Sequence, residues 1–322
     1  MKLSLTSSPH LHATQDLKSV MYDVVIALLP ACAVSMYLFG LRALAVILTA
    51  TVAAMAFEAG VLYLRGRKDI KATVFDGSAI ITGILLALNV PPNLPLWMTG
   101  VGSFIAIVVA KHLFGGLGYN IFNPALIARV FLLISYPVHM TAWIAPRMTE
   151  TITAATPLGV LKTEGLAKVQ GSWTNMDFFL GNTGGSLGEM SALALLLGGA
   201  FLLYRKVISW EIPFSMLASL AVFTGIFWMV NPQKFADPLF HLLTGGAIIG
   251  AFFMATDMVT SPVTPKGMLV FGVGIGLLTG LIRLFGGFPE GVSFAILIMN
   301  ALVPTIDKYT KTRKFGTQGV VA

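Results

Sequence analysis

Long apolar runs recur along the whole chain, and they limit the possible folds more than any other feature. A bilayer core of about 30 Å requires roughly 20 apolar residues per helical span, and the 322-residue sequence supplies such runs repeatedly. Only 11% of its residues are charged, about half the share in a soluble domain. We therefore expect an all-α integral membrane protein with about ten transmembrane helices, at residues 21–40, 43–64, 76–90, 95–112, 123–141, 190–204, 212–230, 238–255, 266–285 and 289–305.

Two short blocks of sequence recur at similar offsets in the two halves of the chain. Residues 78–81 read SAII where residues 246–249 read GAII, and residues 113–116 and 284–287 both read LFGG. Five spans in each half would make the halves insert with opposite orientations, as in many transporters. The pattern predicts two inverted five-helix repeats, and its alternative is a chance alignment of glycine-rich helices.

This repeat divides the chain into three parts. Residues 1–141 hold the first five spans, and residues 190–322 hold the last five and a basic tail. Residues 142–189 form the long polar loop between them.

The third and eighth spans are expected to break inside the membrane. Asn89 is followed by Pro91 and Pro92, and Asp257 is followed by Pro262; proline cannot continue a helical hydrogen-bond ladder. Because the repeat aligns Asn89 with Asp257, we expect the two broken ends to face each other and line a polar cavity. Asp257 is a candidate cation ligand, since carboxylates suit hard ions; the alternative is a solvated side chain at the inner interface.

Lysine and arginine are distributed unevenly between the two sides of the predicted bundle. If the N-terminus lies inside, the inner face collects most of them, including those of residues 65–71 and of the C-terminal tail. The positive-inside rule then places both termini in the cytoplasm and the 142–189 loop outside. The net charge of +7 is what binding of the inner face to an anionic lipid leaflet requires. We therefore expect no nucleic acid partner.

The sequence lacks the motifs of several redox and hydrolytic sites. Its single cysteine, Cys32, can form neither an internal disulfide nor a thiolate metal cluster. No nucleophile–base pair, P-loop or Rossmann fingerprint is visible. We therefore do not expect this chain alone to bind NAD or to hold an iron–sulfur cluster.

Asn120, Asn123 and Arg129 are candidate cofactor-binding residues around the start of the fifth span. Asn123 followed by Pro124 is typical of a helix N-terminus, whose free N–H groups suit a cofactor or an anion; a plain helix start is the simpler interpretation. Arg129 lies inside the span. A lone intramembrane arginine is costly, so it should face a partner charge or a bound anionic group.

Thr156 lies in a short pattern of small and hydroxyl residues in the long loop. The pattern is an acidic residue, two spacers, Ser or Thr, a small residue and then Ala-Thr, and residues 150–156 fill it. It resembles the site at which a flavin transferase esterifies FMN, through its phosphate, to threonine. Glu150 stands where Asp is usual, and Ala154 where Gly is usual.

Several motifs together resemble one family across nearly the whole chain. This family contains RnfD of the Rnf complex and NqrB of the Na⁺-translocating NADH:quinone reductase; the short segment ahead of the first span favours the Rnf branch. The motifs are SPH at 8–10, MYDVVIALLPA at 21–31, DGS at 76–78, KHLFGGLG at 111–118, NPA at 123–125 and ATPL at 155–158.

The resemblance implies a fold related to urea transporters and FMN attached to Thr156. It also implies a second, noncovalent flavin such as riboflavin, and ion-coupled electron transfer between ferredoxin and NAD in a bacterial cytoplasmic membrane. The implied partners are membrane iron–sulfur subunits, a second covalent flavoprotein subunit, cytoplasmic NAD- and ferredoxin-reacting subunits, and the flavin transferase.

Three other functions remain open from the sequence. One is the role of the quinone-reductase protein NqrB itself. Another is a solute transporter of the urea-channel type, which would explain the repeat and the broken helices without redox chemistry. The third is a scaffold that holds flavoprotein and iron–sulfur partners while carrying no cofactor. Bound flavin separates the last two from an electron-carrying subunit.

Overall fold

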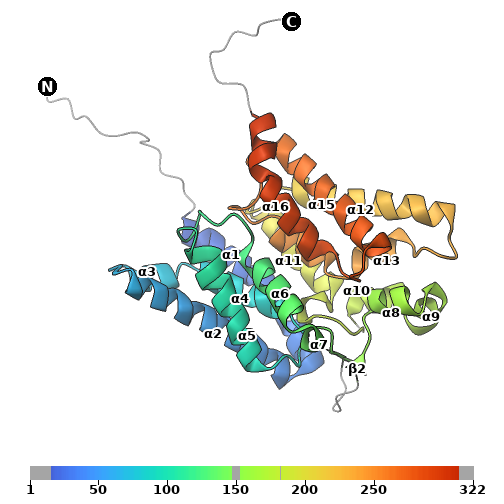
Figure 1. Cartoon of the computed structure of the whole chain (residues 1–322), viewed down its shortest axis with the longest axis horizontal. Helices are drawn as coiled ribbons and strands as arrows, with labels where there is room; N and C mark the ends of the chain where they lie inside the picture. The colour runs from blue at the N-terminus through green and yellow to red at the C-terminus, as the bar shows by residue number, and fades with distance from the viewer. Residues whose placement is uncertain (1–15, 147–152, 182, 312–322) are drawn as a thin grey trace, which may run out of the picture.

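The computed structural model describes residues 16–146, 153–181 and 183–311, which are almost entirely helical (Figure 1). The exception is a two-stranded antiparallel pair, β1 (Trp143–Ile144) with β2 (Thr153–Ala154). Among the described residues, six helices or helix pairs are long and apolar enough to cross a membrane. The expected class, an all-α multi-pass membrane protein, is confirmed.

The N-terminal part contains five long or broken helices. Their segments are α1 (Leu17–Phe39), α2 (Leu41–Leu64), α3 (Ile70–Val74), α4 (Ser78–Leu88), α5 (Leu96–Phe104) with its π-helical continuation η1 (Ile105–His112), and α6 (Pro124–Ser135). The connection that follows is built of short pieces, which are α7 (Pro137–Met140), β1, β2, α8 (Pro157–Thr163), α9 (Leu166–Ser172), α10 (Asn175–Leu180) and the 3-10 turn η2 (Leu187–Glu189).

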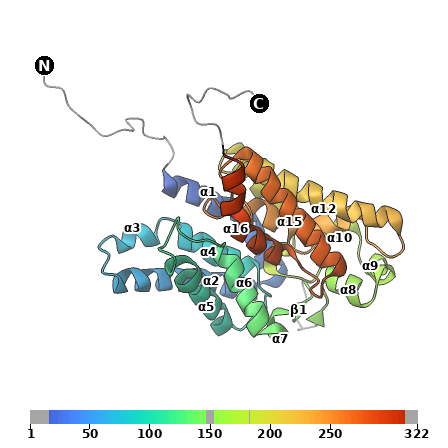
Figure 2. The ribbon, with the colours of Figure 1, turned by 45° about the horizontal axis from the view of Figure 1, so that its top comes forward.

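The C-terminal part also contains five long or broken helices. Their segments are α11 (Ala192–Tyr204), α12 (Glu211–Val230), α13 (Pro238–Leu243), α14 (Ala247–Ile249) with its π-helical continuation η3 (Gly250–Met254), α15 (Pro265–Phe285) and α16 (Val292–Tyr309). Figures 1 and 2 agree in placing α3 and the α8–α9 pair at opposite sides of the molecule.

Glycines let neighbouring helices approach closely. A Cβ at Gly83 of α4 would lie 2.6 Å from the Thr51 Cα of α2, and one at Gly198 of α11 would lie 2.1 Å from the Ala27 carbonyl oxygen of α1. Helices in lipid have little hydrophobic driving force between them, so small residues that admit close packing stabilise their association. The glycine-rich runs of the sequence are therefore helix interfaces.

Two helix boundaries differ from the sequence expectation. The fifth predicted span ends early, because α6 stops at Ser135 ahead of Pro137, and the residue before proline disfavours helical backbone. The eighth predicted span is already broken near its start, where Gly245 and Gly246 have φ of 64° and 66°. Such left-handed backbone is accessible mainly to glycine, and it separates α13 from α14.

Candidate functional site

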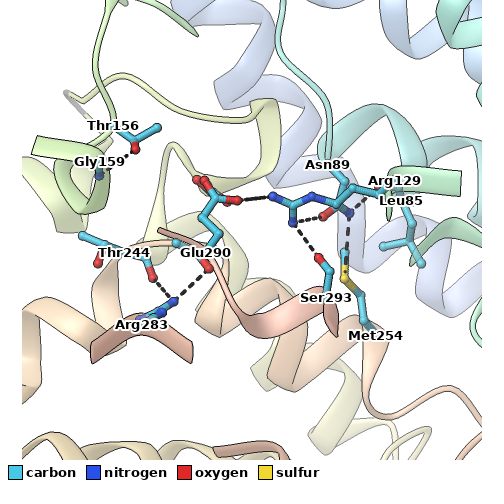
Figure 3. Close-up of polar contacts among 12 residues, drawn as sticks. Leu85, Asn89, Arg129, Thr156, Gly159, Thr244, Met254, Arg283, Glu290 and Ser293 are labelled. Atoms are coloured by element: carbon cyan, nitrogen blue, oxygen red, sulfur yellow. Dashed lines mark hydrogen bonds and ion pairs between the residues drawn. The ribbon is translucent and has the colours of Figure 1, made fainter. Parts of the chain in front are cut away.

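Arg129 of α6 lies at the centre of a buried polar cluster (Figure 3). Its Nη1 donates to Asn89 Oδ1 at 2.9 Å and to Ser293 Oγ at 3.0 Å, and its Nη2 pairs with a carboxylate oxygen of Glu290. A second carboxylate oxygen, Glu189 Oε1, lies 3.8 Å from Nη2. Arg129 therefore faces the partner charge that its cost inside a membrane requires.

The two glutamates come from two connections that lie far apart in the chain. Glu189 ends η2 just before α11, and Glu290 lies in the turn between α15 and α16. In the sequence Glu290 reads as an ordinary residue at a span edge, and Glu189 has no distinguishing pattern. The sequence predicts only that Arg129 needs an anionic partner. It does not identify Glu189 and Glu290 as the partners.

Arg283 of α15 stabilises the break between α13 and α14. Its Nη2 donates to the carbonyl oxygens of Thr244 and Gly245, each at 2.9 Å (Figure 3). Its positively charged group thus lies at the carbonyl-rich end of α13, where a cation is favoured. Its position near a span end suggests an outer-face charge, but Arg283 is instead buried within the protein.

Lys111 of η1 has a similar role at the first broken helix. Its Nζ donates to Ser78 Oγ at 2.7 Å, at the start of α4, and pairs with Glu58 Oε1 at 2.6 Å. The side chains of Lys111 and Glu58 are only 3% and 1% exposed, so this is a fully buried ion pair. A position near a span end favours a solvated charge, but Lys111, like Arg283, is buried within the protein.

Thr156 caps the N-terminus of α8, with Pro157 as the first helical residue. Its Oγ1 accepts a hydrogen bond from the Gly159 amide at 3.1 Å, and its side chain is buried. Ala154 of the predicted flavin pattern lies in β2, while Glu150 lies outside the described residues. Thr156 is therefore buried against the protein at the start of α8.

Thr156, Glu189 and Glu290 line the same small pocket. Thr244 and Gly245, the carbonyl partners of Arg283, complete part of the wall. The candidate attachment residue and the Arg129 cluster therefore belong to one site, which the sequence did not predict.

Asn120, Asn123 and Asp257 line a second and larger cavity. The predicted helix cap is confirmed, because Asn123 Oδ1 accepts from the amides of Ala125 and Leu126 at 3.1 and 3.3 Å. Most of the remaining wall is apolar, including residues of α1, α4, α11 and η3. Lys111 adds a cation to this wall.

The broken helices meet, but Asn89 faces Arg129 whereas Asp257 lines the larger cavity. Asn89 Nδ2 lies 3.8 Å from Met254 Sδ at the end of η3, whereas its Oδ1 belongs to the Arg129 cluster. Asp257 accepts instead from Thr260 Oγ1 at 3.1 Å beside the larger cavity. No group of three or more His, Cys, Asp or Glu side chains in the described part of the chain could hold a metal ion. A cation on Asp257 stays a prediction.

Known proteins resemble the chain over nearly its full length. It is 45% identical over 322 residues to the D subunit of the proton-translocating ferredoxin:NAD(+) oxidoreductase complex of Clostridium ljungdahlii, covering 98% of this chain and 96% of that protein. It is 47% identical over 319 residues to the D subunit of the Na(+)-translocating complex of Acetobacterium woodii, with the same coverages.

A more distant relative has a less specific name. The D subunit of an ion-translocating oxidoreductase complex of Cronobacter sakazakii is 41% identical, covering 98% of this chain and 99% of that protein. The model of the NQR2, RnfD, RnfE family matches residues 4–316. The chain is a member of the NQR2, RnfD, RnfE family.

Proposed function

We propose that this chain is the membrane flavoprotein subunit of an ion-translocating ferredoxin:NAD⁺ oxidoreductase, and that it carries electrons on FMN esterified to Thr156. The observation that carries the proposal is the placement of Thr156 in one pocket with the buried Arg129 cluster. The names of the relatives from Clostridium ljungdahlii and Acetobacterium woodii favour an electron-transfer complex over a solute channel or a cofactor-free scaffold.

Two features near Thr156 support a phosphodiester there, although the pocket itself is small and is lined by two carboxyl groups. The hydrogen bond from the Gly159 amide to Thr156 Oγ1 is one that a phosphodiester oxygen can also accept. The guanidinium groups of Arg129 and Arg283 offset negative charge on this side of the bundle. Because the pocket is small, the linkage and the flavin ring are proposed to extend outward from Thr156.

FMN supplies the electron chemistry when it is attached, and the chain supplies position and electrostatics. Tethering at Thr156 prevents loss of the flavin, and the cap of α8 fixes the start of the tether. The buried ionic cluster sets the local potential, because charges in a low-dielectric environment interact more strongly than in water.

The larger cavity is the proposed site of a second, noncovalent flavin such as riboflavin. Ligand pockets are mostly apolar with a few placed polar groups, and this cavity combines apolar walls with Asn120, Asn123, Lys111 and Asp257. Arg129 does not line it, so the candidate cofactor-binding residues divide between two sites.

The fold is proposed to be two inverted five-helix repeats of the urea-transporter type, in residues 1–141 and 190–322. The order of elements supports this, because each part has two long helices, a broken helix and two further helices. The contact between α1 and α11, the first helix of each part, supports it as well. So does the shared placement of Lys111 and Arg283, each against a residue at a helix break.

The proposed location is a bacterial cytoplasmic membrane with both termini in the cytoplasm. The proposed partners are membrane iron–sulfur subunits, a second covalent flavoprotein subunit, cytoplasmic subunits that react with NAD and ferredoxin, and a flavin transferase. The relatives pump different ions at nearly equal identity to this chain. Overall similarity therefore does not assign its coupling ion.

The proposal is tested by coexpressing the chain with its flavin transferase. The band on a denaturing gel should fluoresce under ultraviolet light, and the peptide containing Thr156 should be heavier by FMN less water. Acid extraction of the native protein should release a second flavin. An unmodified Thr156 peptide under these conditions would sink the covalent-flavin proposal.

The topology predicts which surface cysteines can be labelled in whole cells. In a Cys32→Ala background, Ser172→Cys on α9 should react with an impermeant thiol reagent, whereas Lys68→Cys should react only after the membrane is opened. Both side chains are exposed in the structure, so accessibility within the chain does not differ between them. The reverse labelling pattern would overturn the topology.

A further inference from the structure

Glu189 is the less closely paired carboxyl of the Thr156 pocket, although Ser186 donates a hydrogen bond to it. Arg129 commits Nη1 to Asn89 and Ser293 and pairs through Nη2 with Glu290. Glu189 Oε1 lies 3.8 Å from that Nη2 and has no hydrogen-bond partner, although its side chain is only 8% exposed. Two carboxyl groups of the pocket wall, Glu189 and Glu290, thus share one guanidinium, and Glu290 is the closer of the two.

The backbone around Glu189 is shaped closely to its carboxyl group. A Cβ at Gly185 would lie 3.1 Å from Glu189 Oε2, and one at Gly246 would lie 3.1 Å from Oε1. Both distances are tighter than ordinary contacts, so a larger residue at either position would crowd the carboxyl. Close packing against Gly185 and Gly246 therefore restricts the position of the Glu189 carboxyl, which lines the same pocket as Thr156.

A negative charge added to this pocket has few ways to be balanced. The charged groups that face Glu189 are Glu290 from the turn before α16, Arg129 from α6 and Arg283 from α15. Arg283 donates to backbone carbonyls, which keeps its guanidinium in place. Burying an unpaired charge is costly, so a further anion favours a proton on the less engaged carboxyl.

We propose that Glu189 is the redox-linked proton acceptor of this site, taking up a proton when an electron enters the flavin on Thr156. This inference rests on the proposed function. One electron passes to the flavin from an external one-electron reductant, and one proton passes from water to a Glu189 oxygen, forming an O–H bond. The charge of the pocket and its tethered flavin is then unchanged by the reduction.

The pH range of the effect follows from the environment of Glu189, which lies outside the apolar helices. Burial, and then the charge of Glu290, raise the pKa of Glu189 to about 8. Below that pH the carboxyl is already neutral in the oxidised protein. Above it the carboxyl is ionised, so reduction must be accompanied by proton uptake.

The test is a potentiometric titration of the covalent flavin in the purified complex at a series of pH values. Above about pH 8, each pH unit should disfavour reduction in the wild-type protein up to tenfold more than in Glu189→Gln, which is about 59 mV per unit for one electron. Glu164→Gln, an exposed residue after α8, is the matched control and should behave as the wild type.

Peptide mass analysis of Thr156 in each variant separates the two proposals. An unmodified wild-type peptide refutes the proposed function, whereas modified peptides with the same pH dependence in wild type and Glu189→Gln refute the inference alone. A wild-type potential that follows the sodium ion concentration and not the pH would assign Glu189 to a bound cation and also overturn it.

A second measurement needs no variant. Infrared difference spectra of the wild-type complex, taken above pH 8 on reduction, should show a protonated carboxylic acid band that shifts in heavy water. Reduction without such a band would overturn the inference even if Glu189→Gln failed to fold.

Discussion

Replacing Thr156 by alanine is expected to remove all covalent flavin from the chain. The proposal places the phosphoester on this hydroxyl, and no other threonine of the loop follows the same Ala-Ala pattern. The gel fluorescence should therefore vanish, while the protein still inserts into the membrane. The loss of the helix cap should cost about 0.5–2 kcal/mol of stability, which lowers the melting temperature without preventing folding.

Thr156→Asn separates the two roles of the side chain. Asparagine is among the preferred N-cap residues but carries no hydroxyl for a phosphoester, so this variant should keep the stability and lose the flavin. Thr163→Ala is a control on the same helix, since its exposed hydroxyl only bonds to the Gly159 carbonyl. Fluorescence that survives in Thr156→Asn would place the flavin on a different residue.

The membrane class and the helix positions could be predicted because they depend on local properties. Apolar runs place α1 and α2 within a few residues of the predicted spans, and the Asn123-Pro124 pair correctly places the start of α6. The Asn89–Pro92 segment likewise marks the end of α4. Each of these signals is read from neighbouring residues.

The pocket could not be predicted in the same way, since it joins residues far apart in the chain. Arg129 meets Glu290 and Glu189, and neither glutamate lies in a motif that distinguishes it from a span-edge residue. The burial of Lys111 and Arg283 could not be predicted either, because position near a span end does not tell whether a side chain turns inward. Partner identity requires the tertiary structure.

The same limit applies to the broken helices. Proline marked the ends at Asn89 and Asp257, and the repeat suggested that their side chains would share one cavity. The structure directs Asn89 toward Arg129 and Asp257 toward the larger cavity. A repeat predicts where equivalent backbone lies; the side chains that differ between its halves can enter different sites.

Replacing Arg129 by methionine is expected to destabilise the protein strongly. The substitution leaves Glu290 buried without its partner, and breaking a buried ion pair in this way costs about 3–5 kcal/mol. The melting temperature of the purified protein in detergent should fall well below that of the wild type. Reduced flavin content after folding at low temperature would show that the pocket depends on the same cluster.

The double variant Arg129→Met/Glu290→Gln should recover most of this loss, because it removes the unpaired charge, and replacing both members of a buried pair is often close to neutral. Arg67→Met is the matched control: the guanidinium of Arg67 pairs with Asp69 at 3.1 Å, and the two side chains are 58% and 52% exposed. Such a partly solvated pair contributes about 0–1 kcal/mol, so its melting temperature should change little. If the double variant were as unstable as Arg129→Met, the loss would come from the hydrogen bonds of Arg129 to Asn89 and Ser293 and not from the stranded carboxylate.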